Sequence, residues 1–371
     1  MPYTTGLPAL SLFSGIGGLD TGVSRAGFSV RSANEYDADS VASLRANHFA
    51  DSPERVITDS IVDVPTDRLL AAAGLRAGEV SLVVGGPPCT PFSKSGYWLE
   101  YKRKGLDPNA SLLDEYARVV EEAAPEAALL ENVHGLAYRN HNAKPFGRLL
   151  GRLHSAGYQT RTAVLNMADY GIPQLRKRLI IYAVRGAEPP AFPLPTHSGW
   201  TETSRRIDPS RMPYMTSREA IGDLEQRSDL AEPDEIVGGQ FGRLLPAIPP
   251  GENYLFFTEK RGHPAPLFRW RSRYWTFLLK LDPDRPATTI QSQPGPYVGP
   301  FHWDNRRLRL LEVKRLQTFP DDYVVVGSRR SAQSQLGNAV PPRFAELVAR
   351  PLAEMLNGCS QPSDQLALLT A

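Results

Sequence analysis

A cysteine in a proline-rich loop is the first feature of this sequence that could do chemistry. Residues 85–96 read GGPPCTPFSKSG and follow an apolar stretch, 80–84, that is typical of a buried parallel strand. Cys89 would then lie at the carboxyl end of that strand, where open α/β sheets place their sites. Its thiolate would be a strong nucleophile. The alternative is a buried structural cysteine, for which a loop of three prolines is a poor place.

An acid and two arginines come from later apolar stretches. Glu131 lies in LLENV, where partial burial would keep it protonated as a general acid. Arg176 and Arg178 lie in QLRKRLIIY and lead into another strand. Residues two apart on a strand share a face, so both guanidiniums could grip one carbonyl or phosphate. The alternatives are an ion-paired or helix-capping glutamate and a solvated basic edge.

A glycine turn near the start could hold a ligand. SLFSGIGGLD places Gly15 and Gly17 directly after a strand, where free N–H groups at the next helix would face a ligand. Asp20 stands where a dinucleotide fingerprint has its third glycine, which disfavours a pyrophosphate and suits an amino or sulfonium group. Glu35, in NEYD after the second strand, could accept hydrogen bonds from ribose hydroxyls. A plain tight turn without a ligand is the alternative.

The elements that must position these residues alternate between strands and helices. Up to about residue 189, apolar strands alternate with helical patterns such as 112–123, which indicates an α/β doubly wound, Rossmann-like sheet. Residues 190–325 are rich in proline, arginine and aromatics, which predicts a second, smaller, irregular domain. The stretch QLGNAVPPRFAELVARPLAEML predicts a loop and an amphipathic helix that returns to the sheet. We therefore expect 326–371 to complete the domain formed by 1–189.

Composition narrows the class of protein. The chain has 371 residues, 41% of them hydrophobic, so it can bury a large core. Its two cysteines give neither a disulfide framework nor a zinc spacing. The N-terminus does not read as a signal peptide and no stretch is typical of a membrane span, so we expect a cytoplasmic protein without a membrane partner. The formal net charge of +2 neither indicates nor excludes binding to nucleic acid. Only the local distribution of basic residues can indicate such binding.

Taken together and in order, these motifs resemble the DNA cytosine-5 methyltransferases of bacterial restriction–modification systems. FSGIGGLD, NEYD and the Asp59 of ITDSI are similar to the family's S-adenosylmethionine site, GPPCTPFS to its nucleophile loop, ENV to its acid motif and QLRKR to its Gln-x-Arg-x-Arg motif. RPATTI and GNAVPP resemble the last two motifs. The resemblance covers almost the whole chain except residues 190–280.

The resemblance implies a cofactor and a set of contacts. S-adenosyl-L-methionine would be converted to S-adenosyl-L-homocysteine, and the residues expected to touch it are Phe13, Gly15, Ile16, Gly17, Glu35, Tyr36, Asp59, Pro88, Leu112, Asn338 and Val340. No metal is expected. The expected catalytic residues are Cys89, Glu131, Arg176 and Arg178.

The chemistry gives Cys89 a specific task. Carbon 5 of cytosine is a poor nucleophile, and adding a thiolate to carbon 6 makes an enamine that is nucleophilic at carbon 5. A protonated Glu131 would donate to N3, and Arg178 would hold the O2 carbonyl with support from Arg176. The cytosine must leave the duplex, because its ring face is unreachable in the stack.

Two basic segments are candidates for contact with double-stranded DNA. Ser93, Lys94 and Ser95 follow the cysteine and suit phosphate contacts. KRGHPAPLFRWRSRYWTFLLK contains six basic residues and no acid. If its centre were a strand, Arg269, Arg271 and Arg273 would project to one side, as base readers or as phosphate anchors.

Other functions are compatible with parts of this pattern. The nearest is an RNA cytosine-5 methyltransferase of the same fold; a non-catalytic DNA-binding homologue and an NAD-dependent oxidoreductase fit the motifs less well. We expect a monomer on DNA that is either solitary or paired with a cognate restriction endonuclease acting on the same site. The target sequence cannot be deduced from these residues.

Overall fold

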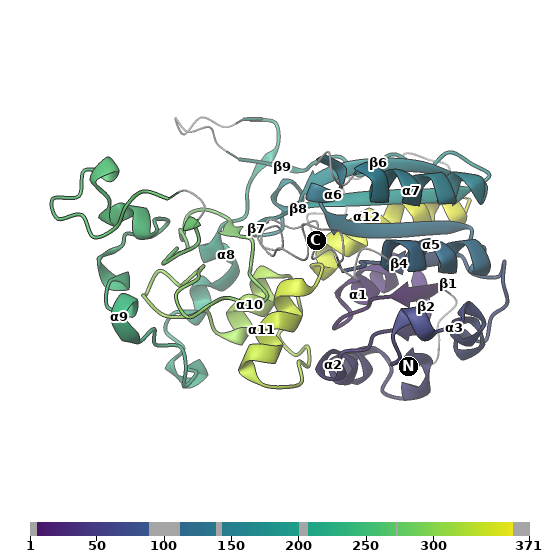
Figure 1. Cartoon of the computed structure of the whole chain (residues 1–371), viewed down its shortest axis with the longest axis horizontal. Helices are drawn as coiled ribbons and strands as arrows, with labels where there is room; N and C mark the ends of the chain where they lie inside the picture. The colour runs from purple at the N-terminus through teal and green to yellow at the C-terminus, as the bar shows by residue number, and fades with distance from the viewer. Residues whose placement is uncertain (1–5, 89–111, 139–142, 200–206, 272–273, 359–371) are drawn as a thin grey trace.

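A mixed seven-stranded sheet forms the larger lobe of the molecule (Figure 1). The computed structural model describes residues 6–88, 112–138, 143–199, 207–271 and 274–358. The strand order is β3-β2-β1-β4-β5-β8-β6; the first five strands are parallel, and β8 runs antiparallel to β5 and β6. The strands are β1 (Leu7–Leu12), β2 (Phe28–Asn34), β3 (Val56–Ile57), β4 (Leu82–Gly85), β5 (Ala127–Val133), β6 (Tyr158–Asn166) and β8 (Lys177–Arg185). The predicted α/β class is confirmed.

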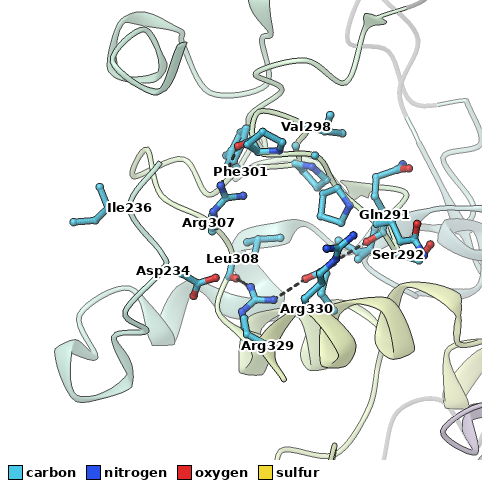
Figure 2. A pocket seen from close by; sticks show the side chains of 18 residues that line it. Asp234, Ile236, Gln291, Ser292, Val298, Phe301, Arg307, Leu308, Arg329 and Arg330 are labelled. Atoms are coloured by element: carbon cyan, nitrogen blue, oxygen red, sulfur yellow. Dashed lines mark hydrogen bonds between the residues drawn. The ribbon is translucent and has the colours of Figure 1, made fainter. Parts of the chain in front are cut away.

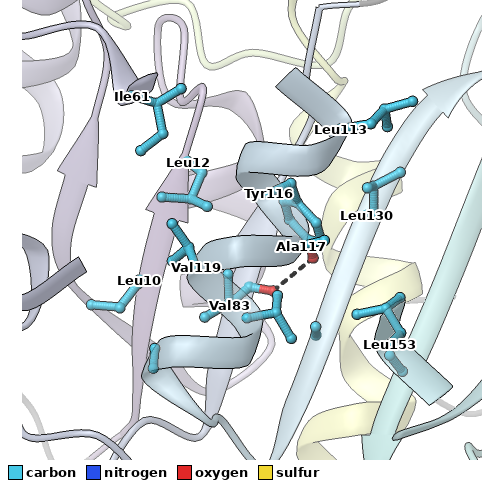
Figure 3. Packing of buried hydrophobic residues seen from close by; sticks show 14 of the residues in the cluster. Leu10, Leu12, Ile61, Val83, Leu113, Tyr116, Ala117, Val119, Leu130 and Leu153 are labelled. Atoms are coloured by element: carbon cyan, nitrogen blue, oxygen red, sulfur yellow. Dashed lines mark hydrogen bonds between the residues drawn. The ribbon is translucent and has the colours of Figure 1, made fainter. Parts of the chain in front are cut away.

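One face of the sheet is covered by three helices. Side chains alternate between the faces of a strand, and Leu10, Val83 and Leu130 point to the face that packs on α3 (Thr66–Ala73), α5 (Leu112–Ala123) and α7 (Ala143–Ser155). The phenol of Tyr116, on α5, is buried there and donates to the carbonyl of Val83 at 3.2 Å (Figure 3). This bond fixes α5 on β4, the strand that leads to the proline-cysteine loop.

The other face is covered by helices from opposite ends of the chain. Leu82, Leu129 and Ile180 pack there against α1 (Gly18–Arg25) and α12 (Pro342–Leu356). The two helices approach so closely that a Cβ at Gly22 would lie 2.3 Å from the Cβ of Ala345. The predicted return of a C-terminal helix to the first sheet is therefore confirmed. Helix α2 (Ala38–His48) covers the β2–β3 edge through a small apolar cluster of its own.

The second lobe consists of short elements joined by long loops, as the composition predicts. Its strands and helices are β9 (His197–Ser198), β10 (Met212–Pro213), β11 (Ala287–Thr288), α8 (Ser217–Ile221), α9 (Gly239–Gly242) and α10 (Leu310–Leu316). Helix α11 (Arg329–Asn338) follows and packs against α10. Strand β11 pairs with β7 (Gln174–Leu175), and α6 (Gly135–Tyr138) follows β5. Among the described residues of both lobes, 3₁₀ turns occur at Pro53–Arg55, Ile61–Asp63, Met167–Tyr170, Gly222–Leu224, Ser228–Leu230, Leu245–Ala247, Tyr254–Phe257 and Glu259–Arg261.

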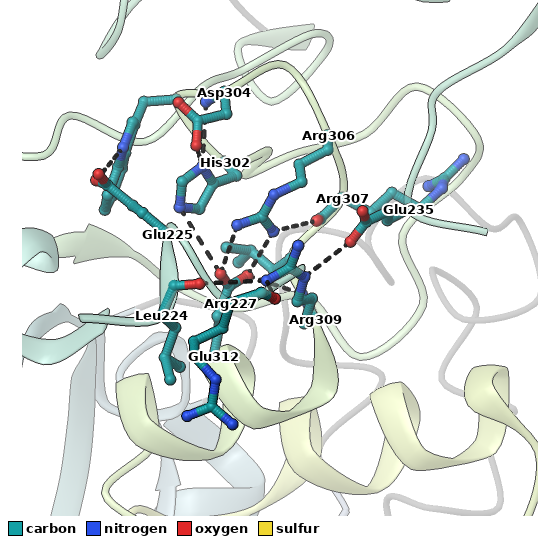
Figure 4. A network of polar contacts seen from close by, with 12 residues as sticks. Leu224, Glu225, Arg227, Glu235, His302, Asp304, Arg306, Arg307, Arg309 and Glu312 are labelled. Carbon is teal, nitrogen blue, oxygen red and sulfur yellow. Dashed lines mark hydrogen bonds and ion pairs between the residues drawn. The ribbon is translucent and has the colours of Figure 1, made fainter. Parts of the chain in front are cut away.

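A buried polar network holds this lobe together in place of a large sheet (Figure 4). The carboxylate of Glu312 accepts two hydrogen bonds from Arg306, at 2.7 and 2.9 Å, and one from the backbone N–H of Arg309. The Arg309 guanidinium donates to Glu235 at 2.8 Å and to the carbonyl of Leu224. Burial lowers the pKa of the neighbouring His302 to about 3, which leaves it neutral. The network ties residues 224–235 to 302–312.

The sequence-based boundaries hold best where the pattern is strongly periodic. Helix α5 has the expected bounds, and β4 begins two residues later than the apolar stretch. The GN motif was expected in a loop, but Gly337 and Asn338 end α11. Residues 264–271 form no strand, so the condition under which Arg269 and Arg271 would share a strand face is not met in the part described. No helix within the described residues is long and apolar enough to cross a bilayer.

Candidate active site

The glycine turn after β1 has the backbone of a ligand-binding loop. Phe13, Gly15 and Gly17 all have positive φ, of 55°, 55° and 88°. A positive φ is strained for a phenylalanine, and such strain is concentrated at functional sites. A Cβ added to Gly15 would meet no atom within 4 Å. Gly15 is therefore not needed for packing, and it leaves open space beside the turn.

Glu35 holds the turn from the end of β2. One carboxylate oxygen accepts the Gly15 N–H at 2.8 Å, and the other accepts the N–H groups of Tyr36 and Asp37, both at 2.9 Å. Burial raises its pKa, and the three backbone N–H groups oppose that shift. A carboxylate has about four acceptor positions, so Glu35 can hold the turn and still accept from a ligand hydroxyl.

Tyr36 and Asp59 lie on the same edge of the sheet. Tyr36 is 70% exposed, an unusual state for a large aromatic residue beside a buried acid. Asp59 follows β3 and accepts from Arg68 at 2.5 Å; both side chains are about half exposed. The Asn34 amide fixes this corner by donating to the carbonyls of Ile57 and Asp59. An aromatic face and a carboxylate are thus available next to the glycine turn.

Asp20 differs from the expectation that its charge faces a ligand. Its side chain is completely buried, and neither oxygen has a hydrogen bond of normal geometry to a described residue. Burial raises its pKa to about 7, and the nearby Ser11 hydroxyl offsets only part of that rise. Asp20 therefore lies inside the molecule behind the turn rather than on its open side.

Glu131 and Arg178 meet at the junction of β5 and β8. The Nε of Arg178 lies 2.8 Å from Oε1 of Glu131, and the two side chains are 14% and 11% exposed. The other Glu131 oxygen lies against Gly86, where an added Cβ would come within 3.3 Å of it. The side chain of Asn132 donates to the carbonyl of Pro87 at 3.1 Å. The acid motif is thus joined directly to the start of the proline-cysteine loop; Cys89 itself lies outside the described residues.

Arg176 does not share the face of Arg178. It falls between β7 and β8, is 2% exposed, and donates to the carbonyls of Gly337 at 3.0 Å and Ala339 at 3.2 Å. Because the strand is interrupted at Arg176, the two-residue periodicity does not place Arg176 and Arg178 on one face. The expectation that both guanidiniums bind one ligand is therefore wrong. Arg176 instead anchors the junction of α11 and α12 beside the site.

The remaining expected cofactor residues surround the same edge. Leu112 is half-buried at the first turn of α5, and Pro88 is half-buried before the cysteine. Asn338 is exposed at the end of α11. The carbonyl of Val340 lies so close to Gly18 that an added Cβ would be 2.2 Å from it. The C-terminal motif therefore packs directly on the helix that begins at the glycine turn.

Two further residues of the site, His48 and Tyr323, are not predicted by any motif of the sequence. The phenol of Tyr323 donates to the carbonyl of Ile16, and His48 Nε2 lies 3.1 Å from the phenol oxygen and 3.0 Å from the Thr21 hydroxyl. Tyr323 is 307 positions away from Ile16, and neither residue stands in a motif of its own. The chain offers no spacing signal that could have joined them.

A basic cavity lies between residues 290–301 of the second lobe and the first turns of α11 (Figure 2). Its volume is about 610 Å³, and Arg307, Arg329 and Arg330 lie on its walls. Residues 289–301 form one side of the cavity and are fixed to β7. The Thr289 hydroxyl donates to the Leu175 carbonyl at 2.9 Å, and the Ile290 N–H donates to the Gln174 side chain.

The free polar groups of this cavity differ from its structural ones. Arg329 is committed to Glu232, Gln333 and the Leu308 carbonyl. Arg330 and Gln293 are exposed and have no hydrogen bond or ion pair with any residue that the structure describes. Ile236 is 82% exposed on the same cavity. A free guanidinium, a free amide and an exposed apolar group suit contact with nucleic acid.

The structure describes only part of the basic segments that are expected to contact DNA. Arg269 and Arg271 are exposed, whereas Ser93, Lys94, Ser95 and Arg273 lie outside the described residues. Trp270 does not stand on a strand face, and the ammonium of Lys260 lies 4.3 Å from its ring centroid.

Comparison with known proteins identifies the family. The model of the C-5 cytosine-specific DNA methylases matches residues 7–354. The chain belongs to this family. The type II methyltransferase M.SacI of Streptomyces achromogenes is 46% identical over 94% of this chain and 93% of its own length. This methylase therefore carries out cytosine-5 methylation of DNA and uses a methyl donor.

Solved structures share the fold of the methylase at low sequence identity. A DNA modification methyltransferase encoded within an E. coli prophage aligns with a TM-score of 0.62, at 21% identity, over 95% of this chain and 99% of its own. The S. pombe Dnmt2 methyltransferase aligns with a TM-score of 0.58, at 16% identity, over 96% and 99%. These likenesses support the Rossmann-like arrangement of the sheet.

Proposed function

We propose that the methyl donor is S-adenosyl-L-methionine and that it binds at the carboxyl ends of β1, β2 and β3. The open space beside Gly15 would admit it, Glu35 would accept from the ribose hydroxyls, and the exposed Tyr36 would pack on the adenine. Asp59 would accept a hydrogen bond from the adenine amino group. Its carboxylate would then either keep its contact with Arg68 as well or give that contact up. Phe13, Ile16, Gly17, Pro88, Leu112, Asn338 and Val340 complete the proposed site. When bound, the cofactor supplies an electrophilic methyl group.

The proposed reaction begins with Cys89. Its thiolate adds to carbon 6 of a flipped-out cytosine, and the electron pair of the 5,6 double bond makes carbon 5 nucleophilic. Glu131 donates a proton to N3, and Arg178 holds the O2 carbonyl. After carbon 5 takes the methyl group, the N3 proton returns to Glu131, a base removes the carbon-5 proton and the thiolate leaves, which restores the 5,6 double bond.

The observation that carries this proposal is the contact of Arg178 with Glu131 beside Gly86. An acid and a guanidinium that already touch can bind adjacent N3 and O2 atoms of one cytosine edge together. The Asn132–Pro87 hydrogen bond gives the loop before Cys89 a fixed starting point next to them. We assign Arg176 a supporting role through the α11–α12 junction.

Double-stranded DNA is the proposed substrate, with residues 190–325 as the recognition domain and 1–189 plus 326–371 as the catalytic domain. Arg269 and Arg271 in the second lobe and the free Arg330 at the cavity are proposed contacts, together with Ser93, Lys94, Ser95 and Arg273. We further propose a cytoplasmic enzyme that acts as a monomer and protects host DNA from a cognate endonuclease.

Bisulfite sequencing of DNA from a host that expresses this chain tests the proposal. Protected cytosines should share one sequence context, and they should disappear when Cys89→Ala is expressed instead. Purified enzyme with radiolabelled S-adenosylmethionine and matched DNA and tRNA should label the DNA. Label in tRNA alone would contradict the DNA substrate.

A further inference from the structure

The carbonyl groups of the glycine turn are held from behind by a chain of side chains. The Ile16 carbonyl accepts from the Tyr323 phenol, and the Gly17 carbonyl accepts from the Thr21 hydroxyl at 2.8 Å. Both hydroxyls in turn contact the same nitrogen, Nε2 of His48, at 3.1 and 3.0 Å. These side chains therefore control the orientation of two consecutive peptides in the turn.

The hydrogen-bond pattern defines the state of His48. The Tyr323 and Thr21 protons are already donated to backbone carbonyls, so each hydroxyl oxygen can only accept from His48. Nε2 must then carry the hydrogen, which makes the ring a donor at that position. Burial lowers the pKa of His48 to about 4. The ring is therefore neutral at physiological pH, with its proton on Nε2.

The ring also fills the space behind the turn. A Cβ at Gly17 would lie 2.7 Å from Cδ2 and 2.8 Å from Nε2 of His48. With a φ of 88° as well, position 17 admits only glycine without rearrangement. The shape of the turn and the place of the imidazole are thus set together.

Tyr323 comes from a segment that is itself tied to α2. The Asn47 side chain donates to the Val324 carbonyl at 2.8 Å and accepts the Val324 N–H at 3.0 Å. Ser43 accepts the Val326 N–H at 2.8 Å. The Phe319 and Tyr323 rings pack 4.8 Å apart. The segment after α10 therefore presents the phenol at a fixed position, although it lies far along the chain from the turn.

We infer that Tyr323 and His48 are positioning residues for the methyl donor. They hold the Ile16 and Gly17 carbonyls toward the interior, which fixes the backbone of the turn beside the open space at Gly15. They reach the cofactor only through the turn. This inference rests on the proposed cofactor site.

The test compares two tyrosines that make the same kind of bond. Tyr182 is buried like Tyr323, and its phenol donates to a backbone carbonyl, that of Val348, away from the turn. Tyr323→Phe and Tyr182→Phe should lower the melting temperature to a similar extent. Calorimetry with S-adenosylhomocysteine should give a Kd roughly 3- to 10-fold higher for Tyr323→Phe only, the size of one neutral hydrogen bond.

Kinetics should show the same separation. Tyr323→Phe should raise the KM for S-adenosylmethionine and leave kcat and the KM for DNA within about twofold of wild type. Equal Kd values for wild type and Tyr323→Phe, or equal weakening in both phenylalanine variants, would overturn the inference. A wild-type chain that binds no S-adenosylhomocysteine would overturn the cofactor proposal, and this inference with it.

A second pair of variants serves if Tyr323→Phe does not fold. The amide nitrogen of glutamine can take the place of Nε2 as a donor, whereas leucine only fills the space. His48→Gln should keep the Kd for S-adenosylhomocysteine within about threefold of wild type, and His48→Leu should raise it about tenfold. Equal Kd values for the two variants would contradict a donor role.

Discussion

The Nε of Arg178 lies 2.8 Å from Oε1 of Glu131, on neighbouring antiparallel strands and almost out of contact with solvent. The register pairs Val133 with Arg178, so the two side chains reach each other diagonally across the ladder. In the absence of a substrate the two groups form an ion pair, but Oε1 of Glu131 accepts no hydrogen bond of normal geometry from a described residue. A flipped-out cytosine would replace this contact with one hydrogen bond to each of them.

Removing the acid should therefore slow the reaction without affecting cofactor binding. We expect Glu131→Gln to lower kcat roughly 10²- to 10⁴-fold, the usual contribution of a general acid. Glu126→Gln is the matched control, because Glu126 precedes the same strand at its other end, where it accepts from Ser81. Single-turnover methylation and calorimetry with S-adenosylhomocysteine measure both effects. A Glu131→Gln rate within twofold of wild type would exclude Glu131 from the mechanism.

The two arginines of the QLRKR motif should fail in different ways. Arg176→Met leaves the Gly337 and Ala339 carbonyls without their buried donor, so the free energy of unfolding should fall by about 1–3 kcal/mol. Arg178→Met should instead lower kcat by about 10²-fold or more, the usual loss when one charge-stabilising donor is removed. Urea unfolding and initial rates of both variants separate the two roles. The reverse pattern would mean that the assignments are exchanged.

Asp20 should make stability depend on pH. Its pKa is about 7 in the folded chain against an ordinary value of 3.8, so between these values the folded chain keeps a proton that the unfolded chain has released. The free energy of unfolding should then fall as pH rises from about 4 to 7 and level off above 7. Asp20→Asn removes this loss, so its stability relative to wild type should increase over the same window.

Asp51→Asn is the control for Asp20→Asn, because Asp51 is exposed on a turn and its substitution makes the same change of side chain. Chemical unfolding at pH 5 and pH 8 gives the required difference. Parallel stability curves for wild type and Asp20→Asn would show that burial does not hold the proton on Asp20.

Arg330 should contribute to DNA binding, and Arg329 to folding. If Arg330 contacts phosphate, Arg330→Ala should weaken binding to cognate and scrambled duplexes equally. The slope of log K against log salt concentration should then fall in magnitude by about one. If it reads a base, the loss should be about 1–3 kcal/mol and confined to the cognate site. Arg329→Ala should lower stability, because its guanidinium holds Glu232 and the Leu308 carbonyl.

Arg269→Ala and Arg271→Ala, measured in the same salt series, test the arginine-rich surface. If Arg330→Ala leaves DNA binding unchanged while Arg269→Ala or Arg271→Ala weakens it, the cavity is not part of the DNA surface.

Local patterns predicted the strand ends well because parallel strands bring them to one edge. The glycine turn, Glu35 and Glu131 could be placed there from alternating apolar stretches and turn residues alone. Helix α5 was equally clear, since its apolar positions recur with the helical period. In these cases the residues that determine the structure are neighbours in the sequence.

The features that local sequence patterns did not predict all depend on long-range contacts or on irregular segments. The contacts from Tyr323 to Ile16 and from Arg176 to the Gly337 carbonyl join segments far apart, and no local spacing encodes them. Residues 264–271 form no strand although charged and aromatic side chains alternate there, because proline-rich loops and aromatic packing determine the path of the chain. Burial of Asp20 could not be anticipated, because it depends on α12 and the Tyr323 segment packing around α1.

Trapping with 5-fluorocytosine tests the central claim, attack by Cys89 on carbon 6, most directly. A duplex that carries 5-fluorocytosine at the target position, once bisulfite sequencing has defined it, cannot lose a proton from carbon 5, so the thiolate cannot leave. With S-adenosylmethionine present, wild type should form a denaturation-resistant adduct whose mass equals chain plus methylated DNA strand, with Cys89 as the attached residue. Cys89→Ala should bind the same duplex and form no adduct. An adduct with Cys89→Ala, or attachment at another residue of the wild-type chain, would contradict the mechanism.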